Sequence, residues 1–329
     1  MANYKELEGF GVQTLATDPD NTSWVGSIFY NSTEGTFKTV KPGGIAAGTW
    51  ASLNSMNTAR EQQAGAGTSS NGFIVGGYVP PGITATGITE LWDGSSWTET
   101  GDLNTGRRLL SASGTYTAGL AFGGYTTTNS ALNESFNGST WTEVGDLNTA
   151  RNSSGGTGTS TSSLMTGGTA PPGLQAVNES WNGSTWTEVG DLNTARRYIA
   201  MAGVSNTSAL IAGGGPTANA SVESWNGTSW TEIADINTAR WSLGGNGTQT
   251  SMLVYGGEEP APSSKTESWN GTSWTEVNDL SAGKYGNGAF GLNNSQAIYA
   301  GGVSPPASVV ATAEEWLAPD VVINTLTTS

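Results

Sequence analysis

The sequence predicts an all-β fold, a six-bladed β-propeller, from three observations. A repeat of 44 to 47 residues occurs six times along the 329-residue chain. In each copy a tryptophan sets the phase, and a cation follows it ten residues later. The composition, with 48 Gly, 13 Trp and 12% charged residues, suits short strands and tight turns rather than amphipathic helices. The phase-setting tryptophans are Trp50, Trp97, Trp141, Trp186, Trp230 and Trp274, and the cations are Arg60, Arg107, Arg151, Arg196, Arg240 and Lys284.

Each repeat holds four short strands, a to d. In the third copy we expect strand a at 151–159, strand b at 162–168, strand c at 176–182 and strand d at 185–190. Strand b ends on a diglycine, and strand c carries Glu-x-aromatic. An Asn-Gly or Asp-Gly dipeptide joins c to d and tolerates the positive φ angles of a tight hairpin turn. Strand a has few bulky side chains, so we place it at the crowded centre and the aromatics of c and d between blades.

The two ends of the repeat array are complementary. The segment around Trp50 supplies a lone strand d, whereas the last repeat ends after strand c at Trp316. We expect these strands to pair and close the ring, which leaves no unpaired edge between first and last repeat. The predicted parts are an N-terminal segment with a short β-hairpin at 1–47, the propeller at 48–316 and a tail at 317–329, which could add a strand to a partner or run along the last blade.

The repeat resembles the kelch repeat. A diglycine after an apolar strand, an aromatic residue, a Trp shortly after it and an Arg at the start of the next blade are similar to that family over all six copies. The chain departs from the family in using Trp or Phe where kelch domains more often have Tyr, and in the near-identity of its copies.

A second resemblance concerns origin. Kelch arrays of low divergence that are rich in Thr, Asn and Gly resemble structural proteins of marine tailed bacteriophages. The stretch from Trp24 to Lys38, WVGSIFYNSTEGTFK, is similar to a short hairpin module of phage tail-fibre and virion-appendage proteins. The resemblance implies a virion protein.

Most repeated charged residues have a structural interpretation. The six cations and the Glu before each aromatic recur at fixed offsets, so we expect Arg/Glu pairing between neighbouring blades rather than a ring of binding residues. For Asp102, Asp146, Asp191, Asp235 and Asp279 a role in the d–a turn is favoured over calcium binding, because Asp side chains readily accept hydrogen bonds from nearby backbone N–H groups.

The residues that break the repeat are the candidates for recognition. The b–c loops vary most, and they share one face of the disc with the d–a turns, because alternate connections of an antiparallel blade emerge on the same side. Residues just after the phase-setting cation also differ among copies, and we expect them to line the mouth of the channel. The candidate recognition face comprises Tyr78, Tyr125, Arg108, Arg197, Tyr198, Trp241, Glu258 and Glu259. Neutral variation of exposed loops is the alternative.

Composition also narrows the function. Without Cys or His, disulfides, thiolate nucleophiles, imidazole bases and nearly all zinc and copper sites are excluded, and we predict no catalytic, cofactor or metal residues. The formal charge of −15 with only 12 Lys and Arg disfavours nucleic acid, and no apolar stretch approaches the roughly 20 residues of a membrane span.

The resemblances together imply a non-enzymatic virion appendage of the tail-fibre or decoration type. It would contact other virion proteins through residues 1–47, present the propeller to a host-surface glycan or protein or to neighbouring subunits, and could form a homo-oligomer. One alternative is a sialidase-like glycosidase, since Asp93-Gly-Ser-Ser-Trp97 faintly resembles the aspartate box of those propellers and Glu and Tyr could serve as acid and nucleophile. Another is a kelch-type adaptor that binds a peptide.

Overall fold

The computed structural model describes residues 12–82, 84–306, 308–319 and 321–326. The chain divides into two compact units, residues 49–317 and a small unit of residues 1–48 with 318–329. Among the described residues, no helix is long and apolar enough to cross a membrane.

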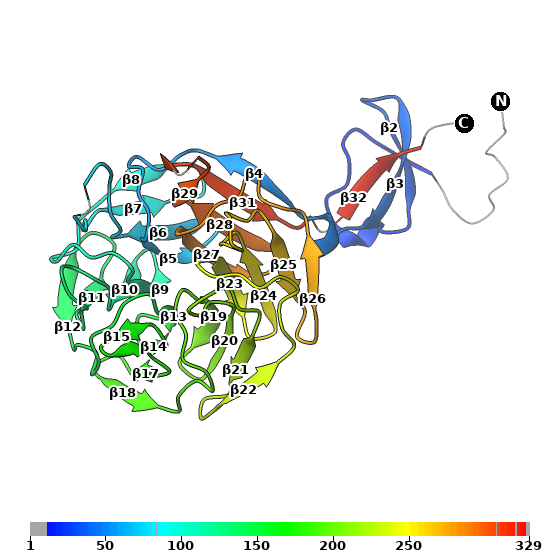
Figure 1. Ribbon diagram of the computed structural model, residues 1–329. Helices are drawn as coiled ribbons and strands as arrows, with labels where there is room; N and C mark the ends of the chain where they lie inside the picture. Colours follow the sequence, from blue (N-terminus) through cyan, green and yellow to red (C-terminus); the bar gives the residue numbers. More distant parts are fainter. Residues whose placement is uncertain (1–11, 83, 307, 320, 327–329) are drawn as a thin grey trace. The chain divides into compact units, whose positions relative to one another are not determined.

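Residues 49–317 form a six-bladed β-propeller, as predicted (Figure 1). Every blade is a four-stranded antiparallel sheet with strands in the order a, b, c, d. Blades 1 to 3 are β5 (Ala64–Thr68), β6 (Asn71–Val75), β7 (Thr89–Trp92) and β8 (Trp97–Glu99); β9 (Ser111–Thr115), β10 (Ala118–Phe122), β11 (Asn133–Phe136) and β12 (Trp141–Val144); and β13 (Gly155–Thr159), β14 (Ser162–Thr166), β17 (Asn178–Trp181) and β18 (Trp186–Val189).

Blades 4 and 5 follow the same order, and blade 6 combines both ends of the array. Their strands are β19 (Ala200–Ser205), β20 (Ser208–Ala212), β21 (Val222–Trp225) and β22 (Trp230–Ile233); β23 (Gly244–Thr248), β24 (Ser251–Tyr255), β25 (Thr266–Trp269) and β26 (Trp274–Val277); and β27 (Gly288–Asn293), β28 (Gln296–Ala300), β31 (Ala313–Leu317) and β4 (Thr49–Leu53). Two short hairpins, β15 (Thr169–Ala170) with β16 (Gly173–Leu174) and β29 (Val303–Ser304) with β30 (Ser308–Val309), lie in b–c loops.

The predicted ring closure is confirmed. Strand β4 pairs antiparallel with β31, and Trp50 lies opposite Trp316. The innermost strands β5, β9, β13, β19, β23 and β27 lie side by side around the axis, with β27 next to β5. Strand a is therefore central, as its small residues predicted. It begins later than predicted, however: in blade 3 it starts at Gly155 rather than at residue 151, because Ser153 takes a positive φ of 57° that ends extended structure.

The hydrophobic core lies between neighbouring blades. Strand b of each blade supplies fully buried apolar side chains, such as Phe73 and Val75 of blade 1, which pack against Phe136 and Trp141 of blade 2. Between blades 5 and 6 the core is formed by aromatic contacts. The centre of the Tyr255 ring lies 4.9 Å from that of Trp50 and 6.1 Å from that of Tyr299. The predicted placing of the c and d aromatics between blades is thus confirmed.

The small unit contains a four-stranded sheet in the order β1 (Gln13–Leu15), β2 (Ile28–Asn31), β3 (Thr36–Pro42) and β32 (Val321–Thr325). Strands β2 and β3 form the predicted hairpin, and β1 lies parallel to β2. Two 3₁₀ turns, η2 (Thr22–Trp24) and η3 (Ile45–Ala47), complete it. The residues after 317 are not a separate tail, and neither predicted alternative for them is right, because β32 pairs antiparallel with β3.

Candidate functional site

One face of the propeller carries both the b–c and the d–a connections, as expected, and we call it the mouth face. In five of the six blades the residue after the phase-setting cation pairs with the residue after the diglycine of the same blade, for example Glu61 with Tyr78, Arg108 with Tyr125 and Trp241 with Glu258. In blade 4 one hydrogen bond, from the Gly215 N–H to the Arg197 carbonyl, takes its place. These backbone pairs repeat around the axis while their side chains differ. The mouth face is thus a nearly sixfold backbone with six different sets of side chains.

A closed ring of backbone hydrogen bonds lies at the centre of the mouth face, and we call it the mouth ring. Each N–H of the ring donates to the carbonyl of the corresponding residue in the preceding blade, with N···O distances of 2.8 to 3.4 Å. All six residues have φ between 54° and 67°, a region that non-glycine residues seldom adopt. The ring consists of Gln62, Leu109, Ser153, Tyr198, Ser242 and Gly286, each two residues after a phase-setting cation.

Six of the eight predicted recognition residues form two contact groups at the mouth ring, to which Tyr198 itself belongs. The guanidinium carbon of Arg108 lies 5.6 Å from the centre of the Tyr78 ring and 5.4 Å from that of Tyr125. In the second group, the Arg197 guanidinium carbon lies 5.0 Å from the Tyr198 ring centre, and Tyr198 meets Trp241 edge to face at 5.3 Å. All six side chains are half-buried.

Carboxylates and phenols gather around blades 1, 5 and 6. The Tyr78 hydroxyl donates a short hydrogen bond to Glu61, and this bond, followed by burial, raises the pKa of Tyr78 to about 12. Burial, and then the charge of Glu61, raises the pKa of Glu258. Burial, and then Glu258 and Glu61, raises the pKa of Tyr285. The last predicted residue, Glu259, lies 3.4 Å from the Lys265 ammonium in the b–c loop of blade 5. The mouth face is therefore acidic on one side, and both of its arginines lie on blades 2 and 4.

The six repeated cations are structural, but their pairing differs from the prediction. Each is buried and forms an ion pair with the Glu of strand c in its own blade, not in a neighbouring blade; examples are Arg60 with Glu90 at 3.1 Å and Arg151 with Glu179 at 3.2 Å. The link between blades comes from the other Glu oxygen. Glu90 Oε2 accepts hydrogen bonds from both the backbone and the side-chain nitrogen of Asn57, which lies on the connection from the preceding blade.

The phase-setting tryptophans connect blades. Trp141 Nε1 of blade 2 donates to Thr89 Oγ1 of blade 1 at 2.9 Å, and Trp274 Nε1 donates to the carbonyl of Ala234, which follows strand d of blade 4. Each also packs on the aromatic residue of strand c in its own blade, as Trp141 does on Phe136 with 4.7 Å between ring centres. Five of the six are buried and Trp50 is half-buried, so we regard them as scaffold residues.

The repeated aspartates and the predicted aspartate box are also structural. Asp102 and Asp146 accept hydrogen bonds from the first backbone N–H of strand c, at 3.3 and 3.2 Å. Asp93 lies in an exposed c–d turn, where hydrogen bonds from the N–H groups of Ser96 and Ser95 lower its pKa to about 2. Among the described residues, no group of three or more Asp and Glu could hold a metal ion.

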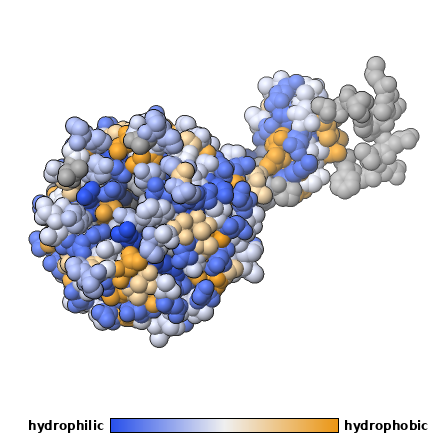
Figure 2. Space-filling view, in the orientation of Figure 1, coloured by the Kyte–Doolittle hydropathy of each residue, from blue (hydrophilic) through white to orange (hydrophobic). Residues whose placement is uncertain are grey.

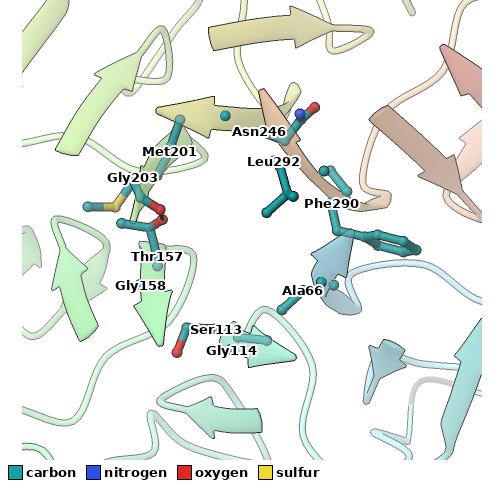
Figure 3. A pocket seen from close by; sticks show the side chains of 18 of the residues that line it. Ala66, Ser113, Gly114, Thr157, Gly158, Met201, Gly203, Asn246, Phe290 and Leu292 are labelled. Atoms are coloured by element: carbon teal, nitrogen blue, oxygen red, sulfur yellow. Dashed lines mark hydrogen bonds between the residues drawn. The ribbon is translucent and has the colours of Figure 1, made fainter. Parts of the chain in front are cut away.

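The innermost strands also surround a cavity of about 260 Å³ along the axis (Figure 3). Its wall is mostly glycine and small residues, and the Phe290 ring points away from the opening. Two of the polar side chains of the wall are already bonded: Thr157 donates to the Gly203 carbonyl and Asn246 to the carbonyls of Asn293 and Gln296. This cavity offers little side-chain chemistry compared with the mouth face.

Sequence reasoning missed part of the mouth face. Glu61 and Tyr285 occupy the same repeat position as Arg108, Arg197 and Trp241, and the mouth ring lies one position later. The signal was present in the repeat phase, because the first two positions after each cation are variable in all six blades.

Comparison with known proteins gives the fold and nothing more specific. The solved structure of YjhT superposes with a TM-score of 0.66 at 14% sequence identity, over 83% of this chain and 99% of that protein. No protein-family model matches the chain, and no curated protein matches it. An identity this low supports a shared β-propeller architecture, which hosts many unrelated functions.

Proposed function

We propose that this chain is a bacteriophage structural protein, a virion appendage of the tail-fibre or decoration type. Its small unit attaches to other virion proteins, and its propeller presents the mouth face to a host-surface glycan or protein or to a neighbouring subunit. The observation that carries this proposal is the unequal division of charge and apolar surface between the two units.

The small unit has the surface of an attachment module. Among its described residues only Phe29 and Val40 are buried hydrophobics, whereas Val12, Val25, Ile28 and Leu326 are between 37% and 46% exposed. Figure 2 shows apolar residues on its surface. A sheet with so small a core gains stability when a partner covers such side chains. Residues 318–329 join the predicted segment 1–47 in this role.

The propeller has the surface of a presented domain. Residues 49–317 contain 21 Asp and Glu against 9 Lys and Arg, so they carry most of the formal charge of −15. A high net charge keeps a domain soluble and disfavours contact with copies of itself. The non-repeating side chains of the mouth face are held on a rigid backbone, an arrangement that favours recognition.

The test is whether the chain co-purifies with intact virions through a density gradient, detected by mass spectrometry of the fractions. Ile28→Asp places a charge on the exposed apolar surface of the small unit, and we expect it to reduce the amount bound per particle. Val204→Asp, at a 55% exposed propeller position, is the matched control and should leave the amount unchanged. Absence of the chain from every particle fraction would reject the proposal.

One observation favours a second function, a sialidase-like glycosidase. Tyr78 and Glu61 are hydrogen-bonded on the mouth face beside Arg108, so a phenol, a carboxylate and a cation lie together. We rank it lower because the pKa of Tyr78 is raised to about 12, which keeps the phenol protonated, although the hydrogen-bonded Glu61 is placed as a general base would be. Turnover of fluorogenic sialosides that disappears in Tyr78→Phe would reverse this ranking.

A further inference from the structure

Two arginines of the propeller are exceptional because, in the part of it that the structure describes, they form no direct ion pair. Of its nine cations, six are buried in ion pairs with the Glu of strand c, and Lys265 pairs with Glu259. Within the described part of the propeller, only Arg108 and Arg197 form no ion pair with an Asp or Glu. In a domain with more than twice as many acids as bases, two unpaired cations on one face mark a place where an outside anion would be favoured.

Both side chains are fixed in place by aromatic rings. Arg108 lies within 5.6 Å of the Tyr78 and Tyr125 ring centres, and its Nη1 donates to Gln62 Oε1 of the mouth ring at 3.4 Å. Arg197 lies over Tyr198. Such contacts reduce the side-chain freedom that is lost when a ligand binds, and they leave the charge in place.

Blade 3 separates the two arginines and contributes amide groups. Asn152 follows the phase-setting Arg151, and its Nδ2 donates to Asn129 Oδ1 at 2.6 Å. Asn129 in turn donates to the Thr169 carbonyl at 3.1 Å. This sector, from Arg108 across Asn152 to Arg197, combines cations, amides and half-exposed tyrosines, whereas the carboxylates Glu61 and Glu258 lie on blades 1 and 5.

The backbone of the mouth face has few groups left for a peptide. The N–H groups of Arg108 and Asn152 donate to the Tyr125 and Thr169 carbonyls, and those of the mouth ring donate to one another. Strand addition by a peptide is therefore disfavoured there, because it depends on free main-chain donors and acceptors. A ligand of this sector must instead be held by side chains.

We propose that the sector between Arg108 and Arg197 binds an acidic saccharide. The guanidinium groups hold its carboxylates through charge-assisted hydrogen bonds, and the exposed parts of the Tyr125 and Tyr198 side chains contact its sugar rings. This inference rests on the proposed function and names the ligand class of the same face.

The experiment titrates the full chain with a hexuronate tetrasaccharide and with its carboxyl-reduced, neutral counterpart in a calorimeter. We expect the acidic sugar to bind and the neutral one to bind at least about tenfold more weakly. This is the change in affinity expected when a hydrogen bond to a charged group is lost. Arg108→Gln and Arg197→Gln should each weaken binding about 10- to 100-fold. Lys41→Gln makes the same charge change in the small unit and should have no effect. Thermal unfolding followed by tryptophan fluorescence verifies that each variant is folded.

Several results would overturn the inference. They are equal binding of the neutral sugar, unchanged affinity in both arginine variants, no binding at about 1 mM, or tighter binding of an oligoglutamate peptide than of the saccharide. These failures are distinguishable from failure of the proposed function. If the chain co-purifies with virions but does not bind acidic sugars, the proposed function stands and the saccharide site is rejected. If the chain binds the sugar but is absent from virions, the saccharide site stands and the proposed function is rejected.

Discussion

At the scale of single residues, the same kinds of side chain have two different roles according to position. Arginines at the phase-setting position are buried and paired with Glu, while those one position later in blades 2 and 4 are half-exposed and form no ion pair. Burial is the physical difference. A buried guanidinium requires a carboxylate partner, whereas a half-exposed one can be stabilised by water and aromatic faces.

Breaking one buried pair should destabilise the propeller strongly. Arg151→Met leaves Glu179 charged and buried, and we expect a loss of about 3–5 kcal/mol in the free energy of unfolding. Adding Glu179→Gln to this variant should restore part of the lost stability, because the second change removes the unpaired charge and keeps an acceptor for Asn148. Urea denaturation followed by fluorescence measures both. Lys265→Met, at the more exposed pair with Glu259, should cost below about 1 kcal/mol, and a similar loss there would contradict the argument from burial.

The Tyr78–Glu61 hydrogen bond should make stability depend on alkaline pH. The folded-state pKa of Tyr78 is about 12, above the ordinary value of 10.0, so the protonated phenol is favoured by folding. Its contribution is fully present below pH 10 and is lost as the pH rises towards 12. The difference in unfolding free energy between wild type and Tyr78→Phe should thus be constant from pH 7 to 9 and shrink above pH 10. A difference that stays constant up to pH 12 would contradict this pKa.

At the scale of elements, glycines determine how each blade meets the next. The second glycine of each diglycine donates its N–H to the carbonyl of the next blade's cation, as Gly124 does to Arg151 at 2.9 Å and Gly302 to Arg60 across the ring closure. The c–d hairpins use a related device. In Asn137-Gly138 only the glycine takes a positive φ, and the Asn side chain accepts hydrogen bonds from the Ser139 and Thr140 N–H groups.

Substituting a diglycine should therefore be costly even with the smallest side chain. Gly124 has φ +102°, and a Cβ there would lie 2.9 Å from the Arg108 carbonyl oxygen. We expect Gly124→Ala to destabilise the propeller by about 1–3 kcal/mol, measured by thermal and urea unfolding. Gly173→Ala is the control, since a Cβ at that position meets nothing within 4 Å and φ is not positive. Equal effects at the two positions would refute the role assigned to the diglycine.

At the scale of the whole molecule, the blades form a ring without first or last member. Strand β4 completes blade 6, and the mouth ring carries hydrogen bonds continuously through all six blades. Within the propeller, unravelling of the array from either end must therefore separate β4 from β31. The closure joins residues far apart in sequence, so forming it closes a long loop at a large entropic cost.

A disulfide across the closure should stabilise the propeller more than one within a blade. Ala51 and Glu315 lie opposite each other in β4 and β31, and the chain has no other cysteine to compete. Loop entropy predicts a gain of about 5 kcal/mol for Ala51→Cys/Glu315→Cys. The equivalent pair of blade 2, Ser135→Cys/Thr142→Cys, closes a short loop and should gain about 2 kcal/mol. Unfolding with and without reductant measures each gain, and equal gains would contradict the loop-entropy argument.

The sequence by itself determined the repeating part of this protein. The phase of the tryptophans, the diglycines and the Asn-Gly dipeptides located all six blades, and counting strands from both ends predicted that Trp50 and Trp316 belong to one blade. These signals are local and are repeated six times. Because all six repeats have the same pattern of side chains, they pack against one another in the same way, with the small residues of strand a at the axis and the aromatic residues between the blades.

Only the tertiary structure decided what does not repeat. It paired β32 with β3, placed the Arg/Glu pairs within blades rather than between them, and brought Arg108 between Tyr78 and Tyr125. The mouth ring likewise needs positive φ at Gln62, Leu109 and Tyr198, residues that no local rule assigns to that conformation. Each of these features depends on contacts between segments distant in sequence, where tertiary hydrogen bonds and packing outweigh local preference.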